Sequence, residues 1–509
     1  MIISSQQISK QKQDGIALLV LVIALALTIS AYYFSNISIT KIKADKLQET
    51  QLALKQAKQQ LLAYAAIRAE MSDPTPQAGR YGYLPCPAST SLAADTGEGN
   101  SVGTCEVKHA NSLGWFPWRS LGVDALKDGN GSCLLYAVSG DYKVAPSTDM
   151  LNEDSNGMFQ VVDEMGVPLP GNTAKDRVAA IIFSAGDALT GQDRNYLDDT
   201  QCGHDIDNFS AYLESLEVSP GDVVDNSSLA TGIADEVYRI VQAATATNKS
   251  VINDQFITIS RDELWSAITA RNDFIVKMSN LTEAMAICLS KYAAANAENR
   301  LPWPAPMNLA DYRLDDNYDD AIPDPVVGLG YAGRFPFKVT DSNARIGIVG
   351  ADVLFTGAVC NNLVLPPDTI TVDGEILARG GITVDLLGGA SDEYENLWKN
   401  WKDHFFYMVS QGYEPVAPPA PPAPPVSASC GNCITVDGTN RAATVIFAGS
   451  SMDQPRNGPP DIDTKQLIAN YLENGNETIF PDITGNGTYV TGGNDIMFCI
   501  GTGLGVVPC

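Results

Sequence analysis

The sequence has little histidine and little positive charge. Only three histidines occur, at His109, His204 and His404, and 33 Lys and Arg residues face 60 Asp and Glu residues, which leaves a net charge of −27. Nucleic-acid phosphates require a basic surface, so DNA and RNA are excluded as partners. The scarcity of histidine argues against a zinc enzyme or a histidine-based triad. No G-x-S-x-G, P-loop, H-E-x-x-H or G-x-G-x-x-G motif stands in a supporting context, so we predict no enzyme, no catalytic residue and no required cofactor.

What is present begins with an apolar run. Residues 1–15 are polar and include Lys10 and Lys12, whereas residues 16–34 are almost wholly apolar. Nineteen helical residues extend about 28 Å, enough to span a bilayer core. Three interpretations of residues 1–34 are open: a cleaved signal peptide, a plain signal anchor, or a short leader followed by an apolar helix. The run is longer than a usual signal-peptide core and lacks a clear A-x-A site.

The apolar run continues without Pro or Gly into a segment with amphipathic spacing. Apolar residues recur there at intervals of three to four, which predicts a helix with one buried stripe. We therefore expect one rod over residues 16–72, about 80 Å long, half in lipid or a filament core and half under a globular head. A membrane anchor with a helical stalk is the alternative. The stripe comprises Leu47, Ala53, Leu54, Ala57, Leu61, Leu62 and Ala65.

These features resemble the prepilin-type subunits of type IV pili and type II secretion systems (pseudopilins). There, a short basic leader ends in Gly, as in Lys10–Gly15 here, and an apolar helix follows. The resemblance implies a leader at 1–15, cleavage between Gly15 and Ile16 by a prepilin peptidase, and methylation of the new amino terminus. It implies other pilin or pseudopilin subunits and the inner membrane as partners. The head would lie in the periplasm and later in a filament at the cell surface.

One position departs from this family. Most members carry Glu at the fifth mature position, where it pairs with the amine of a neighbouring subunit, but this chain has Val20. No acidic residue lies between Ile16 and Lys41. The pseudopilin at the tip of type II secretion filaments also lacks this Glu. The resemblance therefore implies a minor subunit at the tip of a filament, with a role in assembly, adhesion or secretion.

The second half of the chain repeats the first. Seven short blocks recur in the same order, which indicates an internal duplication. The pairs begin at Tyr64 and Tyr292, Leu84 and Leu301, Gly114 and Gly333, Tyr136 and Tyr407, Arg177 and Arg441 (placing Ile181 opposite Val445), Asp205 and Asp461, and Asn253 and Asn494.

The repeat predicts an α+β fold with two tandem pilin-like heads, each a helix on a mainly antiparallel sheet. Only the first helix has an apolar half. Asp262 and Glu263 after Ser260 indicate the start of the second helix. The predicted divisions are head A at 73–260, the second amphipathic helix at 261–299, and head B at 300–509 with a proline-rich insert at 415–426.

An even number of cysteines in an exported chain indicates disulfides. Cys86 with Cys105 is the easiest pair in head A. Cys430 and Cys433 predict a local disulfide at the start of a strand, against a redox centre or a zinc site. Cys499 with Cys509 would hold the last residues, as a carboxyl-terminal disulfide does in many pilins. The remaining pairing stays open for Cys133, Cys202, Cys288 and Cys360.

An acidic loop is the candidate metal site. Clustered carboxylates repel one another unless a cation or solvent intervenes, and calcium prefers oxygen ligands. A solvated acidic loop is the alternative. The candidate ligands are Asp315, Asp316, Asn317, Asp319 and Asp320.

Aromatic residues flank prolines at corresponding positions of the two heads. We expect them to pack in the two cores and not to form an exposed binding surface. They are Trp115, Trp118, Phe335 and Phe337.

These observations predict a non-enzymatic minor subunit of a type IV filament or a type II secretion system. The alternative is a membrane-anchored extracytoplasmic binding protein, such as an adhesin, that uses the heads directly.

Overall fold

The computed structural model describes most of the chain, in stretches. His204, the repeat blocks at 205–207 and 461–463 and residues 416–425 of the proline-rich insert lie outside the described residues. The side chains of residues 7–15, 33–36, 39–40, 371–372 and 375 are also outside the description. The remaining gaps are 1–6, 37–38, 71–77, 90–97, 170–176, 195–201, 203, 230–231, 235, 243–251, 296–297, 325–329, 340–359, 361, 373–374, 387–391, 451–460, 464 and 481.

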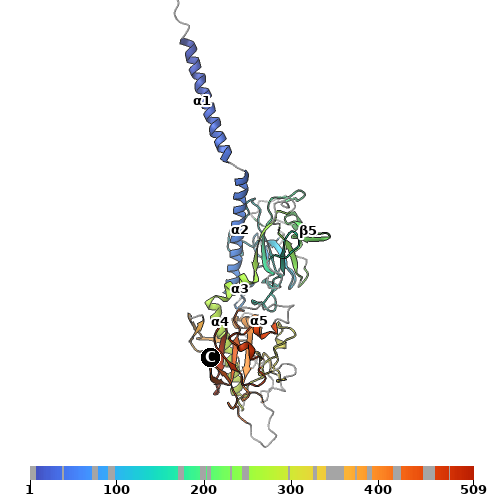
Figure 1. Ribbon diagram of the computed structural model, residues 1–509, viewed down its shortest axis with the longest axis vertical. Helices are drawn as coiled ribbons and strands as arrows, with labels where there is room; N and C mark the ends of the chain where they lie inside the picture. Colours follow the sequence, from blue (N-terminus) through green and yellow to red (C-terminus); the bar gives the residue numbers. More distant parts are fainter. Residues whose placement is uncertain are drawn as a thin grey trace, which may run out of the picture.

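The amino-terminal region contains two helices and not the single helix that the sequence predicts (Figure 1). Helix α1 covers Gln7–Asn36 and helix α2 covers Ile39–Ile67, followed by a 3₁₀ turn at Arg68–Glu70. Ser35 and Asn36, at the end of α1, favour local side-chain bonds over helix, and β-branched residues follow in the sequence. Helix α1 also begins before the predicted start at Ile16.

No helix within the described residues is long and apolar enough to cross a membrane. The membrane segment predicted at residues 16–34 is therefore not confirmed.

Head A is built on a six-stranded sheet in which β4 is central and fully buried. Strand β4 pairs antiparallel with β2 on one side and β8 on the other. Helix α2 packs against β4 and β8 through the predicted stripe, of which Leu54, Ala57 and Leu61 are fully buried. The strands are β1 (Ser112–Trp115), β2 (Leu135–Val138), β3 (Phe159–Val162), β4 (Val178–Ser184), β7 (Tyr238–Val241) and β8 (Gln255–Ser260).

Head B contains a five-stranded sheet in the order β20-β19-β17-β14-β9, and all of its pairs are antiparallel. Helix α4 packs against β17 and β19 of this sheet. The prediction of an α+β fold with a helix on a mostly antiparallel sheet is confirmed in this form. The strands are β9 (Ala332–Arg334), β14 (Phe405–Val409), β17 (Ala443–Phe447), β19 (Ile496–Ile500) and β20 (Val506–Pro508).

The sheets of the two heads share the same central order. Strands β1, β2, β4 and β8 of head A correspond to β9, β14, β17 and β19 of head B, with every neighbouring pair antiparallel. The register agrees as well, because Gly114 lies opposite Tyr136 and Gly333 lies opposite Tyr407. The sequence repeat therefore coincides with a repeated sheet.

The register corrects one part of the sequence comparison. Tyr136 lies opposite Ile182, and Tyr407 lies opposite Val445. Val445 is therefore the counterpart of Ile182 and not of Ile181. A bulge in β4 between Val178 and Ala180 supplies the one-residue difference near the start of the strand.

Individual hydrogen bonds are also repeated. The buried Tyr136 hydroxyl donates to the Pro85 carbonyl at 3.2 Å, and the Tyr407 hydroxyl donates to the Pro302 carbonyl at 3.1 Å. Asn253 Nδ2 donates to Asp187 O at 2.6 Å, and Asn494 Nδ2 donates to Ser450 O at 2.5 Å. Three backbone bonds, each from an amide N to a carbonyl O, are repeated as well. Leu84 to Tyr142 (2.7 Å) matches Leu301 to Tyr413 (2.8 Å), Ala88 to Trp115 (2.8 Å) matches Ala305 to Arg334 (2.9 Å), and Phe116 to Leu134 matches Phe335 to Phe405 (3.0 Å each).

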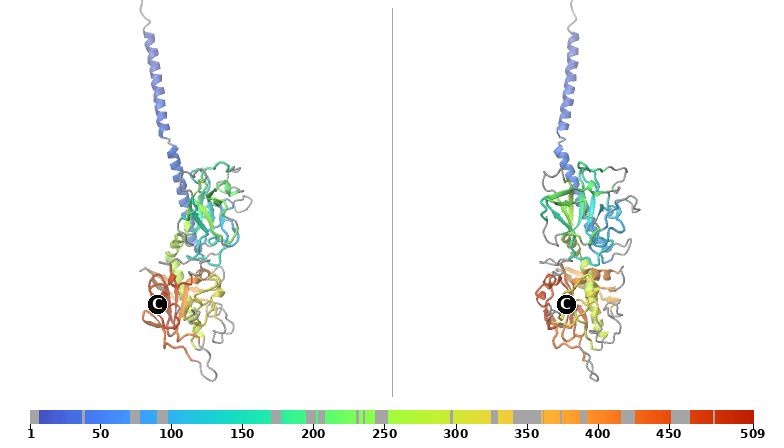
Figure 2. Two further views of the ribbon diagram at one scale, coloured as in Figure 1. Left: turned by 45° about the vertical axis from the view of Figure 1, so that its right-hand side comes forward. Right: turned by 90° about the vertical axis from the view of Figure 1, so that its right-hand side faces the viewer.

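The helix predicted at 261–299 is divided into α3 (Arg261–Thr269) and α4 (Asn272–Ala295). Its predicted start is confirmed, since Ser260 Oγ accepts a bond from Glu263 N at 3.2 Å. Helix α3 packs on α2, whereas α4 packs on the sheet of head B. Arg271 occupies the junction and donates to Ala66 O at 2.8 Å. The division lets consecutive helices pack on different heads: head A lies beside α2, and head B lies beyond the end of α2 (Figure 2).

Smaller elements complete the heads. A short helix, α5, lies between the heads, and its N-cap Asp392 accepts bonds from Tyr394 N at 2.9 Å and Glu395 N at 3.1 Å. These elements are β5 (Ser215–Ser219), β6 (Asp222–Asp225), β10 (Leu363–Leu365), β11 (Asp368–Val372), β12 (Glu375–Arg379), β13 (Ile382–Val384), α5 (Glu393–Trp401), the 3₁₀ turn Lys402–His404, β15 (Ile434–Val436), β16 (Thr439–Arg441) and β18 (Thr488–Tyr489).

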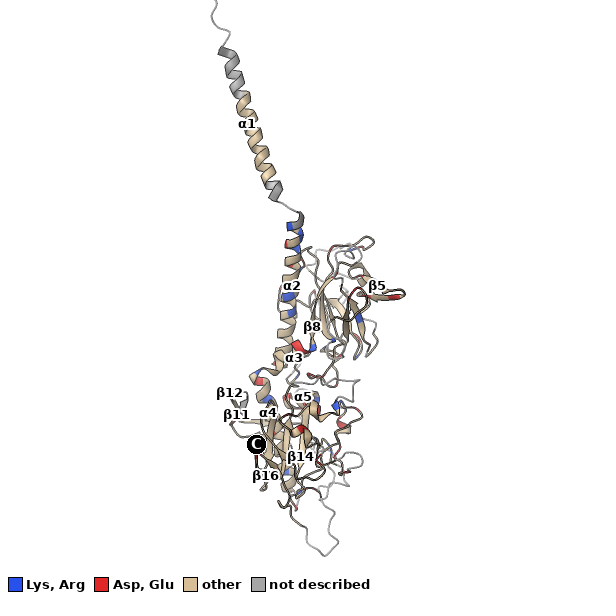
Figure 3. Ribbon diagram, viewed as in Figure 1, with Lys and Arg blue, Asp and Glu red and all other residues tan. Residues whose placement is uncertain are grey.

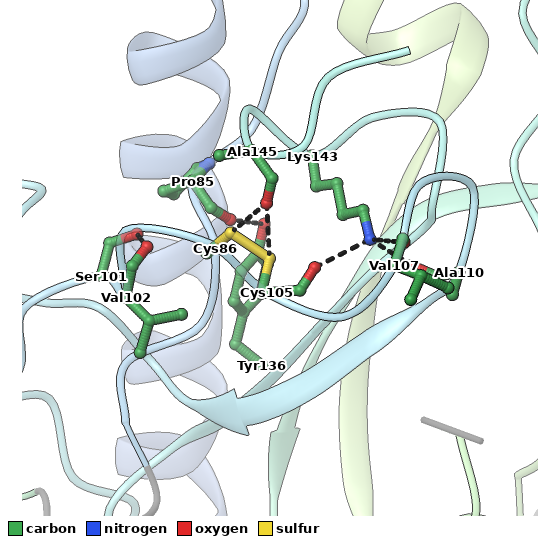
Figure 4. Close-up of a disulfide and its surroundings, with 10 residues drawn as sticks. All are labelled: Pro85, Cys86, Ser101, Val102, Cys105, Val107, Ala110, Tyr136, Lys143 and Ala145. Atoms are coloured by element: carbon green, nitrogen blue, oxygen red, sulfur yellow. Dashed lines mark hydrogen bonds between the residues drawn. A yellow bond between two sulfur atoms is a disulfide. The ribbon is translucent and has the colours of Figure 1, made fainter. Parts of the chain in front are cut away.

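All ten cysteines are paired, in agreement with the predicted disulfide set. Beside the first pair, the buried Lys143 ammonium donates to the carbonyls of Cys105 and Ala110 at 2.8 Å each and to that of Val107 (Figure 4). Burial lowers the pKa of Lys143 to about 8. The pairs are Cys86–Cys105, Cys133–Cys202, Cys288–Cys360, Cys430–Cys433 and Cys499–Cys509.

Candidate functional site

The first candidate surface is helix α1. From residue 16 to residue 32, where its side chains are described, it carries no charged residue and is exposed all round (Figure 3). Leu18 is 67% exposed, Leu21 is 62% exposed, and Ile23 is 50% exposed. A helix that is apolar on every side is typical of a buried environment. Ile16 and Val20, singled out in the sequence, are both on this surface and both exposed.

Helix α2 attaches α1 to head A. Lys46 Nζ donates to Asn130 Oδ1 at 2.9 Å, and Thr50 Oγ1 accepts a bond from Gly129 N at 3.0 Å. Further along, Lys58 pairs with Glu263 at 2.6 Å. These polar contacts flank the buried apolar stripe, so α2 is held to the head along most of its length.

The second candidate surface is the junction of the two heads. Asn400, in α5 of head B, accepts bonds at Oδ1 from Leu151 N at 2.9 Å and from the Tyr83 hydroxyl at 3.2 Å, both in head A. Two tryptophans pack edge to face across the same junction, since the rings of Trp265 and Trp401 lie 5.5 Å apart. The apolar core is thus continuous from head A to head B.

Charged residues are buried at this junction. Asp403 is fully buried, pairs with the Lys465 ammonium, and accepts a bond from Asn152 Nδ2 of head A at 2.8 Å. Burial alone would raise the pKa of Asp403, but the charges of Lys465 and His404 hold the pKa well below its ordinary value. Lys465 also lies 3.2 Å from Asp154 Oδ2. The cluster therefore connects carboxylates of both heads through one ammonium group.

His404 stands within this cluster. Its Nδ1 lies 2.9 Å from Asp403 Oδ1, and its Nε2 faces Glu153 Oε1 at 3.7 Å and Asp154 Oδ2 at 3.6 Å. Among the described residues, Glu153, Asp154 and His404 form the one group of three His, Cys, Asp or Glu side chains whose ligand atoms converge, within 4.8 Å of one another.

A cavity of about 400 Å³ adjoins the cluster between the heads. Asp154 and Lys465 line it, so the charged cluster is accessible from this cavity. Head A supplies the pair His109 and Asp141, joined at 2.5 Å, and head B supplies Asp311, whose carboxylate pairs with Arg313 at 2.9 Å. The volume suits a small polar ligand or ordered water.

The predicted calcium loop has a different geometry. Asp315 pairs with Lys402 at 2.7 Å, Asp316 pairs with Lys338, and Asn317 Nδ2 donates to Asp311 O at 2.7 Å. Asp320 is buried, whereas Asp319 is half-buried. Two of the five predicted ligands thus form ion pairs with lysines. Among the described residues, the carboxylates of this loop form no converging group.

Two other predictions agree with the structure. Cys430 and Cys433 form a local disulfide directly before β15. The four aromatic residues are core residues: Trp115 is 1% exposed, Trp118 9%, Phe335 0% and Phe337 8%.

Sequence reasoning missed the junction cluster. Glu153 and Asp154 lie about 250 positions before His404 in the sequence, so no local spacing signals their contact. The only usable signal was the rarity of histidine, which makes each of the three a candidate for a specific role.

No protein-family model, no curated protein and no solved structure matches the chain.

Proposed function

We propose that this chain is a non-enzymatic minor subunit of a type IV pilin-like or type II secretion-like filament. In this proposal, α1 packs against the equivalent helices of other subunits, and the two heads lie outside the filament core. Five disulfides suit an oxidising, extracytoplasmic compartment.

The observation that carries the proposal is the exposure of α1. A run of Leu, Ile and Val exposed on every side of a helix is costly in water, at about 25 cal/mol for each Å² of apolar surface. Association of several such helices removes that surface from water. The attachment of α2 along head A would then fix the head at the side of the resulting bundle.

The position of head B favours the end of a filament. Head A lies beside α2, and head B lies beyond the end of α2, on the side away from α1 (Figure 1). In a continuous shaft that space belongs to the next subunit, whereas at a tip it is free. Val20 supports the same position, because a subunit without an acidic residue there cannot pair with the amine of a neighbour.

Amino-terminal sequencing of the mature protein tests the processing step. We expect the mature chain to begin at Ile16, and Gly15→Leu to retain the leader. Asp14→Asn, one residue further from the bond, serves as the control and should be processed normally. A mature wild-type chain that begins at any other residue would contradict the proposal.

Incorporation into filaments tests the role of α1. Leu21→Lys places a charge on the apolar helix and should reduce recovery in sheared filaments at least tenfold. Val364→Lys is the matched control, because Val364 is an equally exposed apolar residue of head B, 70% exposed. Normal recovery of Leu21→Lys would contradict the packing of α1 in the filament core.

A further inference from the structure

We propose that Glu153, Asp154 and His404 bind one divalent cation of the zinc class at the junction of the two heads. Glu153 and Asp154 belong to head A and His404 belongs to head B. The cation would therefore join the heads through direct bonds to both.

The first argument concerns the two nitrogens of His404. Asp403 Oδ1 lies 2.9 Å from Nδ1, an ordinary hydrogen-bond distance, and Asp403 also receives bonds from Asn152 and Lys465. A carboxylate surrounded by donors acts as an acceptor, so Nδ1 carries the proton. Binding of a cation requires the neutral imidazole, in which Nε2 presents its lone pair while Nδ1 keeps the proton. A carboxylate behind the ligating histidine is the usual arrangement at metal sites.

The second argument concerns distances. Nε2 lies 3.6 Å from Asp154 Oδ2 and 3.7 Å from Glu153 Oε1. Both exceed the 2.7–3.2 Å range of an N–H···O bond. In a tetrahedral zinc site with bonds of about 2.0–2.2 Å, ligand atoms lie about 3.3–3.6 Å apart. The two distances are close to this spacing, and all three ligand atoms lie within 4.8 Å of one another, so they converge on a space that one cation can fill.

The third argument concerns the surroundings. Asp154 lines the cavity of about 400 Å³, which supplies an entry path and room for a water molecule as the fourth ligand. Asp154 Oδ2 also faces Lys465 Nζ at 3.2 Å and the Tyr471 hydroxyl at 3.4 Å, so a cation at this oxygen would replace Lys465, which has Asp403 as its second partner. The Ser450 hydroxyl donates to Glu153 Oε2 at 2.8 Å and orients this carboxylate toward the site. One imidazole and two carboxylates suit zinc and manganese better than calcium.

Zinc binding by the tag-free, full-length protein tests the proposal. After chelator treatment, we expect the wild type to bind about one Zn²⁺ per chain in competition with a chromophoric chelator. His404→Gln should weaken binding at least ~100-fold, more than the 10–100-fold typical of outer-shell changes. Co²⁺ should give the visible absorption of a tetrahedral site in the wild type and not in His404→Gln.

Two further variants separate ligand loss from misfolding. Glu153→Gln removes one ligand and leaves the pair of Asp403 and Lys465 intact, so it should weaken Zn²⁺ binding with an unchanged circular-dichroism spectrum. His109→Gln is the control, because His109 pairs with Asp141 outside the group. Zn²⁺ should also raise the midpoint of thermal unfolding of the wild type and of His109→Gln. It should leave the midpoint of His404→Gln and Glu153→Gln unchanged. Absence of Zn²⁺ binding in the wild type, or unchanged binding in His404→Gln, would overturn the proposal.

Discussion

Asp254 and Glu214 bring two carboxyl groups together in the interior of head A. Asp254 Oδ2 accepts bonds from Glu214 N at 3.0 Å and Asn226 Nδ2 at 3.1 Å, while Glu214 Oε2 accepts a bond from Asn253 N at 2.9 Å. Burial raises the pKa of Asp254 well above its ordinary value, and the charge of Glu214 raises it further. The carboxyl group of Asp254 is therefore protonated in the folded chain over a range in which the unfolded chain has lost that proton.

This shift predicts a pH dependence of stability. The folded chain binds the additional proton, so the contribution of Asp254 is fully present below its unfolded pKa near 3.8 and is lost as pH rises through the raised folded pKa. Asp254→Asn keeps an acceptor for both bonds and should flatten this decline. At pH 8 we expect an increase of about 1 kcal/mol in the free energy of unfolding. Urea unfolding across pH 5–8 measures it, and an unchanged slope would contradict the assignment.

Helix α2 shows how much of an element its sequence determines. The three-to-four spacing identified most of the buried stripe, since Leu54, Ala57, Leu61 and Ala65 are fully buried, but Leu47 at its start is 49% exposed. The spacing did not reveal the end of α1 at Asn36, which apolar periodicity does not signal, or the division between α3 and α4, which depends on the different heads that these helices contact. The local acidity of the predicted metal loop likewise does not show which lysines fold back onto it, as Lys402 does onto Asp315 and Lys338 onto Asp316.

A matched pair of leucines tests the packing of α2. Leu54→Ala should lower the free energy of unfolding by about 2–4 kcal/mol, since it leaves a cavity against the sheet. Leu52→Ala, two residues away and 58% exposed, should change it by less than about 0.5 kcal/mol. Alanine preserves helix propensity at both positions. Chemical denaturation of the two variants measures the difference, and equal effects would mean that α2 does not pack as described.

At the scale of the molecule, the repeat was readable from sequence and the junction was not. The register of the two sheets agrees at Tyr136 and Tyr407, which the repeated blocks had already aligned. The junction instead depends on Asn400 reaching Leu151 N, a contact between positions 249 residues apart. Such contacts arise from surfaces that meet only after each head has folded, so no periodicity records them.

The continuous core predicts that the heads unfold together. Asn400→Ala removes the acceptor for Leu151 N and for the Tyr83 hydroxyl and should lower the free energy of unfolding by about 2–3 kcal/mol. Asn440→Ala, at an exposed position of head B, should have little effect. Scanning calorimetry of the full-length chain should show one transition that moves as a whole in Asn400→Ala. Two transitions of which only one moves would show that the heads are independent.

The hydrogen bond between a tyrosine hydroxyl and a proline carbonyl occurs twice in this chain, so its contribution to stability can be compared at two sites of one protein. Tyr136 and Tyr407 form this bond at 3.2 and 3.1 Å within one polypeptide, so both bonds experience the same solvent, temperature and concentration. Replacing either tyrosine by phenylalanine deletes one hydroxyl and leaves the other as an internal standard. Any difference between the two variants then measures the influence of local context on a fixed chemical interaction, a comparison that normally requires two separate proteins.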